Sequence, residues 1–192
     1  MSLQQPFIIF LTWVSGAGKT TMMQQLLSQY DQLEQVLSIT TRAPRDGEID
    51  GQDYHFVTLE DFEQQKSDNL FLEYAFVHNS YYYGTRLDWL HEALARWYYP
   101  IKNIDPIGME LVEKEWKLDG KYMSIFMDIS EELMKERILT RQPHMSDEEL
   151  QKRLASAQKE REIASRLQHT IVLDATPPKD IVFAELQRLL EL

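Results

Sequence analysis

Residues 6–27 read PFIIFLTWVSGAGKTTMMQQLL, and this stretch decides the fold class of the chain. Pro6 to Trp13 is a continuous apolar run rich in β-forming residues, which is typical of a strand buried on both faces of a parallel sheet. A glycine-rich turn follows it, and Lys19 to Tyr30 then carries apolar residues at helical spacing. A buried strand, a glycine loop and a helix in this order predict an α/β protein with a parallel sheet core and helices on both faces.

The glycine-rich turn resembles a phosphate-binding loop of the pattern G-x-x-x-x-G-K-[ST]. In such a loop the backbone N–H groups hold phosphates, and the N-terminus of the following helix adds positive potential. Lys19 would reach the β- and γ-phosphates of ATP, and the Thr20 hydroxyl would hold Mg²⁺. The residues expected to bind the ATP phosphates are Ser15, Gly16, Ala17, Gly18, Lys19, Thr20 and Thr21.

The motif departs from its pattern at position 13, where the first glycine is replaced by Trp13. That glycine makes the tight turn out of the strand, and a tryptophan resists a positive φ. The motif alone therefore leaves two alternatives open. The loop is either a nucleotide site with one unusual residue, or an ordinary turn before a helix with Lys19 in solvent.

The composition narrows the classes of function. The chain has 192 residues with a net charge of −11 and no cysteine. Such a charge argues against bulk binding to nucleic acid or to an anionic membrane, and a chain without cysteine has neither disulfides nor a thiolate metal site. The first apolar run is too short to cross a bilayer and no basic region precedes it, so we expect a cytoplasmic protein without a signal peptide.

The rest of the chain alternates between strand and helix patterns. Two capping boxes are expected to start helices, one at Thr58 with Asp61 and one at Ser146 with Glu149. Thr85 is expected to cap a third helix, and residues 78–85 are expected to form a loop. The strands are expected at 36–41, 54–57, 70–77, 98–105, 122–129 and 169–173. The helices are expected at 59–67, 86–97, 107–116, 131–141, 147–167 and from 177 onward.

A second group of motifs is more specific than the phosphate loop. Residues 38–56 read SITTRAPRDGEIDGQDYHF, followed by FLEYA at 71–75 and YYYGT at 81–85. Together with IKNIDPIG at 101–108 and RLASAQKE at 153–160, they closely resemble the guanylate kinase family. The resemblance implies a single domain over 1–192. Its core would be 1–35, 86–136 and 168–192, with an inserted GMP-binding lobe at about 36–85 and a small helical lid at about 137–167.

The residues of the lobe suit GMP chemically. Arg42 and Arg45 can place their guanidinium forks on phosphate oxygens, to which Tyr54 and Tyr83 can donate hydroxyl protons. The resemblance implies that Glu73 accepts the N1–H and N2 amine of guanine, that Ser38 and Thr85 complete recognition of O6 and the base edge, and that Asp105 contacts GMP. The residues expected to bind GMP are Ser38, Arg42, Arg45, Tyr54, Glu73, Tyr83, Thr85 and Asp105.

The implied reaction is phosphoryl transfer from ATP to GMP, with Mg²⁺ on Thr20 and Asp105 reached through water. The residues expected to stabilise the transferring phosphoryl group are Lys19, Arg42, Arg137, Arg141 and Arg153. An alternative for the last three is salt bridging to helix glutamates such as Glu131, Glu132 and Glu136. Asp105 could instead cap a helix. Asp174 is a weaker candidate for a contact near the adenine.

Three hypotheses stay open from the sequence. The chain is an active guanylate kinase, a weak or inactive binding module of the same fold, or a kinase for another nucleoside monophosphate. VHNSYYYGT at 77–85 is one residue longer than the family pattern, and Tyr83 is aligned through Gly84. The expected partners are ATP and GMP, with no nucleic acid and no membrane, in a monomer or homodimer.

Overall fold

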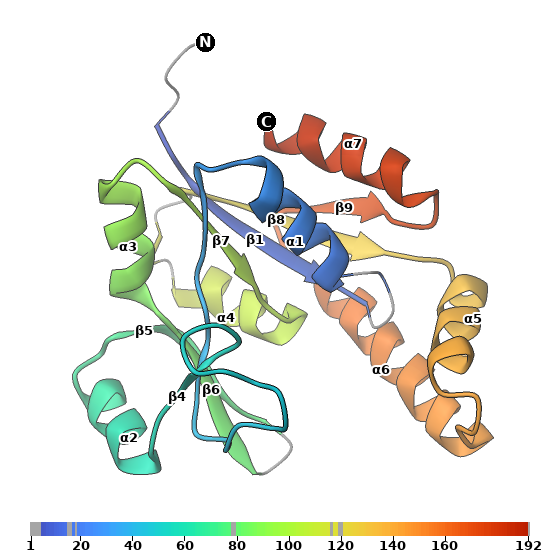
Figure 1. The fold of residues 1–192 in the computed structure, drawn as a ribbon, viewed down its shortest axis with the longest axis horizontal. Helices are drawn as coiled ribbons and strands as arrows, with labels where there is room; N and C mark the ends of the chain where they lie inside the picture. Colours follow the sequence, from blue (N-terminus) through green and yellow to red (C-terminus); the bar gives the residue numbers. More distant parts are fainter. Residues whose placement is uncertain are drawn as a thin grey trace. The chain divides into compact units, whose positions relative to one another are not determined.

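The computed structural model describes residues 5–14, 17, 19–77, 80–115, 117–118 and 121–191 (Figure 1). The chain divides into two compact units. The first unit holds Met1–Ile9, Gln32–Asn103 and Leu111–Tyr122. The second holds Phe10–Asp31, Ile104–Glu110 and Met123–Leu192.

A five-stranded sheet has the order β2-β7-β1-β8-β9. Its strands are β1 (Ile8–Trp13), β2 (Leu33–Gln35), β7 (Tyr99–Asn103), β8 (Tyr122–Asp128) and β9 (Thr170–Asp174). Strand β2 pairs with β7 and strand β8 pairs with β9, both in parallel, with Leu33 opposite Tyr99 and Ser124 opposite Thr170. All six residues of β1 are buried, which explains its unbroken apolar run. The predicted α/β class with a parallel sheet is confirmed.

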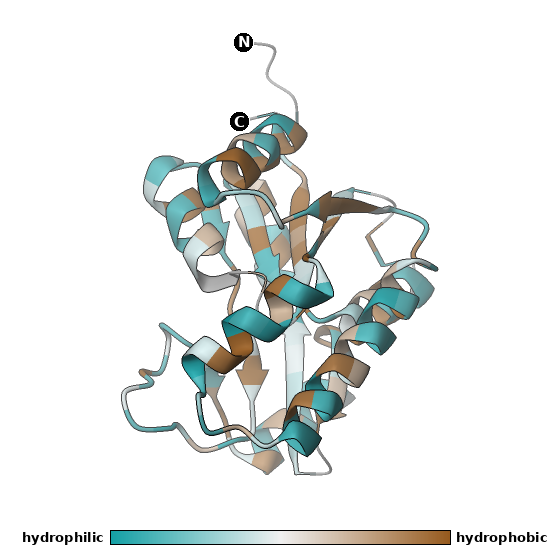
Figure 2. Ribbon diagram, turned by 90° about the vertical axis from the view of Figure 1, so that its right-hand side faces the viewer, coloured by the Kyte–Doolittle hydropathy of each residue, from teal (hydrophilic) through white to brown (hydrophobic). Residues whose placement is uncertain are grey.

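The second unit carries most of the helices around its strands. They are α1 (Lys19–Gln29), α5 (Glu131–Arg141), α6 (Asp147–Ala164) and α7 (Lys179–Leu190), together with the start of α4 (Pro106–Glu115). Helix α6 contacts α5, and α7 contacts β9. Figure 2 shows hydrophilic and hydrophobic residues alternating along these helices, as expected for helices that bury one face. The capping box of Ser146 and Glu149 is confirmed at the start of α6.

A second sheet lies within the first unit, with the order β4-β3-β6-β5. Its strands are β3 (Ile39–Thr40), β4 (His55–Phe56), β5 (Phe71–Val77) and β6 (Tyr81–Arg86). Strand β6 runs antiparallel to both β3 and β5. Helices α2 (Leu59–Ser67) and α3 (Leu87–Ala95) belong to the same unit. The predicted cap of α2 is confirmed, because the Thr58 side chain accepts the Asp61 N–H.

An aromatic core fills the space between this sheet and α2. Ile39, Phe62 and Phe71 are buried together, and the Phe62 ring stacks on Phe71 at 4.6 Å and on Tyr82 at 5.1 Å between centroids. Gly84 is required beside this core, since a Cβ there would lie 2.8 Å from the Phe71 ring. The core therefore occupies one face of the sheet and leaves the other face for polar side chains.

Three local predictions were wrong. The expected strand at 36–41 is divided between two sheets: the Val36 N–H bonds the Ile101 carbonyl beside the first sheet, while Thr40 pairs with Tyr83 in the second. The expected loop at 78–85 contains strand β6, because residues 81–86 find partners on β5. His78 and Asn79 lie outside the described residues. Thr85 belongs to β6 and caps no helix; Arg86 is the N-cap of α3.

Within the described ranges, no helix is long and apolar enough to cross a membrane.

Candidate active site

A row of polar residues crosses three strands of the second sheet on one face. Ile39 pairs with Gly84, and Thr85 pairs with Glu73. The same antiparallel register, continued by one residue, sets Ser38 opposite Thr85. Paired residues of neighbouring strands share a face at spacings of roughly 5 Å. Three of the predicted guanine contacts are thus brought into one line.

The middle of this row is joined by a hydrogen bond. The Thr85 hydroxyl donates to Glu73 Oε1 at 2.5 Å, and Thr85 is fully buried. A buried hydroxyl that donates to a carboxylate fixes the orientation of that carboxylate. Thr85 therefore positions Glu73 from inside the sheet, a role that the sequence did not indicate.

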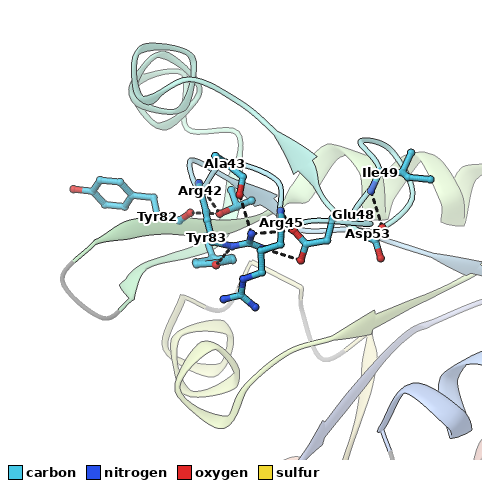
Figure 3. A network of polar contacts seen from close by, with 9 residues as sticks. Arg42, Ala43, Arg45, Glu48, Ile49, Asp53, Tyr82 and Tyr83 are labelled. Carbon is cyan, nitrogen blue, oxygen red and sulfur yellow. Dashed lines mark hydrogen bonds and ion pairs between the residues drawn. The ribbon is translucent and has the colours of Figure 1, made fainter.

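Arg42 closes its guanidinium fork on Glu48 (Figure 3). NH1 lies 2.9 Å from Glu48 Oε2, and NH2 lies 2.9 Å from Oε1. Arg42 also donates from Nε to the Tyr83 hydroxyl at 2.9 Å and from NH1 to the Ala43 carbonyl at 2.8 Å. The arginine is 7% exposed, so its charge is stabilised by these protein partners and not by solvent.

The electrostatics of this pair follow from its geometry. The hydrogen bond to Glu48 raises the pKa of Arg42 above its ordinary value, against the opposing effect of burial. The hydrogen bond from Arg42, with a second from the Arg45 backbone, lowers the pKa of the Glu48 carboxyl below its ordinary 4.5. Both groups are therefore ionised throughout the neutral range.

Carboxylates also order the loop that follows Arg42. Glu48 Oε2 accepts the Arg45 N–H at 2.8 Å, Asp53 Oδ2 accepts the Ile49 N–H at 2.9 Å, and Asp50 Oδ1 accepts the Phe56 N–H at 2.9 Å. Sequence reasoning missed Glu48. It stands inside the quoted motif, but its distance of six residues from Arg42 in a loop implies no contact by itself.

Two tyrosines complete this corner of the first unit. The Tyr54 ring lies 5.4 Å from the Arg42 guanidinium carbon and 5.9 Å from the Tyr83 ring. Burial, followed by the influence of Tyr83, raises the pKa of the Tyr54 hydroxyl, so it stays a proton donor at neutral pH. Arg45 itself is exposed beside this group. The four residues predicted to bind the phosphate of GMP thus lie on or beside one ordered loop.

The predicted phosphate loop belongs to the second unit and is described in part. Ser15, Gly16 and Gly18 lie outside the described residues, as do the side chains of Lys19 and Thr20, whose backbone begins α1. Ala17 is buried and its N–H donates to the Val14 carbonyl at 3.2 Å. Thr21 is exposed on α1.

Trp13 is the last residue of β1 and is only 9% exposed. Its φ is not positive, since the non-glycine residues with positive φ in the described part of the chain are Asn69, Trp97 and Glu191. A tryptophan therefore fits here as a strand residue, and position 13 does not require glycine for its own backbone conformation.

The predicted lid arginines lie on α5 and α6. Arg141 is exposed at the end of α5, Arg137 is half-buried, and Arg153 donates to the Gln142 side chain at 3.1 Å. Among the glutamates named as alternative partners, Glu131 forms an ion pair with Lys135 at 2.6 Å. These placements leave the role of the arginines as a prediction.

An unpredicted ion pair fixes α6. Arg161 Nε bonds both oxygens of Asp128, at 2.9 and 3.0 Å, and its NH2 bonds the Ile129 carbonyl at 2.7 Å. Asp128 is the last residue of β8, so this contact ties the helix to the end of a strand.

The predicted site residues Asp105 and Asp174 lie close to the ends of strands β7 and β9. Asp105 Oδ1 accepts the Gly108 N–H at 2.7 Å at the start of α4, so it has the capping role that was its alternative. Asp174 ends β9, and hydrogen bonds from Thr176 lower the pKa of its carboxyl. In the described ranges, no cluster of three or more His, Asp or Glu could hold a metal.

Lys102, on β7, is a further feature that sequence reasoning missed. It is 2% exposed, and its Nζ donates to the Ser38 hydroxyl at 2.6 Å. In sequence, Lys102 and Asn103 were visible only as two polar residues in the strand expected at 98–105.

The parallel sheet and its helices define an α/β protein, and the first unit carries an ordered loop that holds Arg42. The guanylate kinase family model matches residues 5–191, and the chain belongs to the guanylate kinase family.

Proteins named guanylate kinase are similar to this chain in sequence. A guanylate kinase of Helicobacter pylori is 36% identical over 179 residues, covering 92% of this chain and 84% of that protein. One of Clostridium perfringens is 38% identical over 167 residues, covering 87% and 76%. The crystal structure of guanylate kinase from Anaplasma phagocytophilum shares the fold, with a TM-score of 0.72 at 22% identity over 99% of this chain and 88% of that chain.

Proposed function

We propose that this chain transfers the γ-phosphoryl group of ATP to GMP, giving ADP and GDP by in-line attack. Membership of the guanylate kinase family supports the reaction class. The observation that carries the choice of acceptor is the polar row of Ser38, Thr85 and Glu73 beside the Arg42 loop. We assign GMP to this face of the first unit and ATP to the phosphate loop of the second.

Guanine would be recognised by its hydrogen-bonding edge. Glu73, held by Thr85, would accept the N1–H and N2 amine, and Ser38 would donate to O6. Adenine has neither the N1–H nor the N2 amine, so Glu73 would gain no hydrogen bond from the base. A site that depends on such hydrogen bonds can reject the wrong base by roughly 10⁴-fold.

The phosphate of GMP would meet a preformed group of donors. Arg42 already donates four hydrogen bonds, to Tyr83, Ala43 and Glu48. A guanidinium has five, so Arg42 would offer one further N–H and its charge. Arg45 and the hydroxyls of Tyr54 and Tyr83 would supply the other contacts to phosphate oxygens.

The ATP half would use the phosphate loop and the lid. The backbone N–H groups of the loop from Ser15 to Thr21 would hold the phosphates, except that of Ala17, which bonds the Val14 carbonyl, and Lys19 would reach the β/γ position. Arg137, Arg141 and Arg153 would neutralise charge that develops on the transferring group. In domain terms, 36–85 would form the GMP-binding lobe and 137–167 the lid of a single domain.

Thr20 would bind Mg²⁺ directly, and Asp105 would contact it through a metal-bound water. Oδ1 of Asp105 is engaged by Gly108, while the residue as a whole is exposed. Its Oδ2 has no partner in the described part of the chain and can accept from a metal-bound water. Mg²⁺ is typically held by one or two protein oxygens together with substrate phosphates, and it neutralises their charge when bound.

A coupled assay of ADP release tests the proposal. We expect turnover with GMP far above that with AMP, CMP or UMP. A chain that binds GMP without turnover would be a binding module of this fold, and a preference for another monophosphate would overturn the assignment of Glu73. The variant Lys19→Ala should abolish turnover while leaving GMP affinity unchanged, and loss of GMP binding in it would contradict the assignment of two separate nucleotide sites.

A further inference from the structure

Lys102 is a buried charged residue on a strand of the first sheet. Arg42 and Lys102 are the charged side chains that are buried in the described ranges. Removing an ammonium from water costs several kcal/mol unless hydrogen bonds and opposite charge compensate for it. The neighbouring positions Pro100 and Ile101 on β7 are apolar and buried. An apolar residue at 102 would fit such a strand, so the lysine calls for a specific partner.

Ser38, the first residue of the polar row, is one partner of this lysine. Lys102 Nζ donates to Ser38 Oγ at 2.6 Å, a short charge-assisted distance. Ser38 is held on its other side by its backbone, since its carbonyl accepts the His55 N–H at 2.9 Å. The serine hydroxyl is therefore fixed from behind by the lysine while its backbone is fixed by β4.

This contact sets the direction in which the serine donates. An ammonium has three donors and no acceptor, so Ser38 Oγ must accept in this bond. The single hydroxyl proton of Ser38 remains for a bond to an outside acceptor. A positive charge behind the oxygen also makes that proton a stronger donor.

We infer that Lys102 is a specificity-determining positioning residue, which sets the Ser38 hydroxyl to donate to a 6-oxo group of the purine base. The inference rests on the proposed function, in which Ser38 faces position 6 of the base. A 6-oxo group is an acceptor and fits this donor. A 6-amino group presents N–H donors toward the same hydroxyl and toward the charge behind it, and is disfavoured.

The variant Lys102→Met, similar in length but apolar, tests the inference. kcat and KM are measured with GMP, with inosine monophosphate, which keeps the 6-oxo group but lacks the 2-amine, and with AMP. We expect KM for GMP and for inosine monophosphate to rise together by about tenfold, a change that one lost hydrogen bond can produce. KM for ATP should stay within twofold, and the activity with AMP should not fall. Lys179→Met, an exposed lysine on α7, is the matched control.

A double-mutant cycle with Ser38→Ala separates positioning from packing. If Lys102 acts through the serine, Lys102→Met should change KM for GMP by less than twofold in the Ser38→Ala background. Additive effects, or equal losses with GMP and AMP, would overturn the inference and leave Lys102 a packing residue. Lys102→Gln keeps a donor without the charge and should retain part of the preference for 6-oxo bases, so it serves if Lys102→Met fails to fold.

The two proposals fail in different ways. If the wild-type chain binds GMP without turnover, calorimetric affinities for the same three nucleotides replace KM, and the same pattern is expected. If the wild-type chain binds no 6-oxo purine nucleotide, both proposals fall. If the wild-type chain prefers GMP and Lys102→Met keeps that preference, only this inference falls.

Discussion

Glu48 holds both arms of the Arg42 guanidinium and, with the same carboxylate, the backbone N–H of Arg45. One side chain therefore sets the position of both arginines that we assign to the phosphate of GMP. It does so from a loop in which Gly47 adopts a positive φ of 87°.

The variant Glu48→Gln tests whether this arrangement serves GMP binding and not ATP binding. The amide can accept with one oxygen, but it loses the charge and the bidentate geometry that align Arg42. We expect KM for GMP to rise by roughly tenfold, with KM for ATP unchanged, in steady-state assays. Asp46→Asn, an exposed acid of the same loop, is the control and should behave as wild type. Equal changes in both KM values would show that the loop serves the fold as a whole.

The same pair should make stability depend on acid. The folded-state pKa of Glu48 lies below its ordinary 4.5, so the unfolded chain binds more protons as the pH falls past that value. The contribution of the pair is thus present above about pH 4.5 and is lost as the pH falls through the folded pKa. The free energy of unfolding, measured in urea from pH 7 downward, should fall more steeply for wild type than for Glu48→Gln. If the unfolding free energies of the two proteins fell with the same slope, the pKa of Glu48 would be the same in the folded and unfolded chain.

Glu73→Gln should reduce the preference for guanine. Its amide would present N–H donors to the N1–H and N2 amine of the base, while Thr85 could still donate to the remaining oxygen. We expect kcat/KM for GMP to fall by about 100-fold, in line with a mismatched buried hydrogen bond of 1–3 kcal/mol. The activity with AMP should not fall. Glu60→Gln, at an exposed position of α2, is the control. An equal loss of kcat/KM with AMP in Glu73→Gln would argue against base recognition by Glu73.

The limits of prediction are visible in particular elements. The N-termini of α2 and α6 match their predicted positions, because capping by Thr58 and Ser146 is local chemistry that lies within three residues. Strand β6 was missed because its pairing with β5 depends on a neighbouring strand and not on its own pattern. The bond from Lys102 to Ser38 joins residues 64 apart in the chain, and no local signal reports such a contact.

Gly84→Ala should destabilise the first unit through one contact. The added methyl group would lie 2.8 Å from the Phe71 ring, which is itself packed on Phe62. Overpacking of this kind costs about 1–3 kcal/mol of unfolding free energy. In a Phe71→Leu background the same change should cost less, since the ring that clashes is gone. Equal losses in both backgrounds, measured by urea unfolding, would place the strain in the strand backbone instead.

Trp13→Gly is the test of the unusual phosphate-loop residue. Because Trp13 is a buried strand residue without a positive φ, glycine would relieve no backbone strain and would remove a large apolar side chain. We expect a loss of about 4 kcal/mol in unfolding free energy, as large aromatic deletions in cores show, and a smaller loss for Trp13→Phe. Turnover should be expressed per folded molecule. A glycine variant that is as stable as wild type and turns over faster would show instead that the tryptophan hinders the loop.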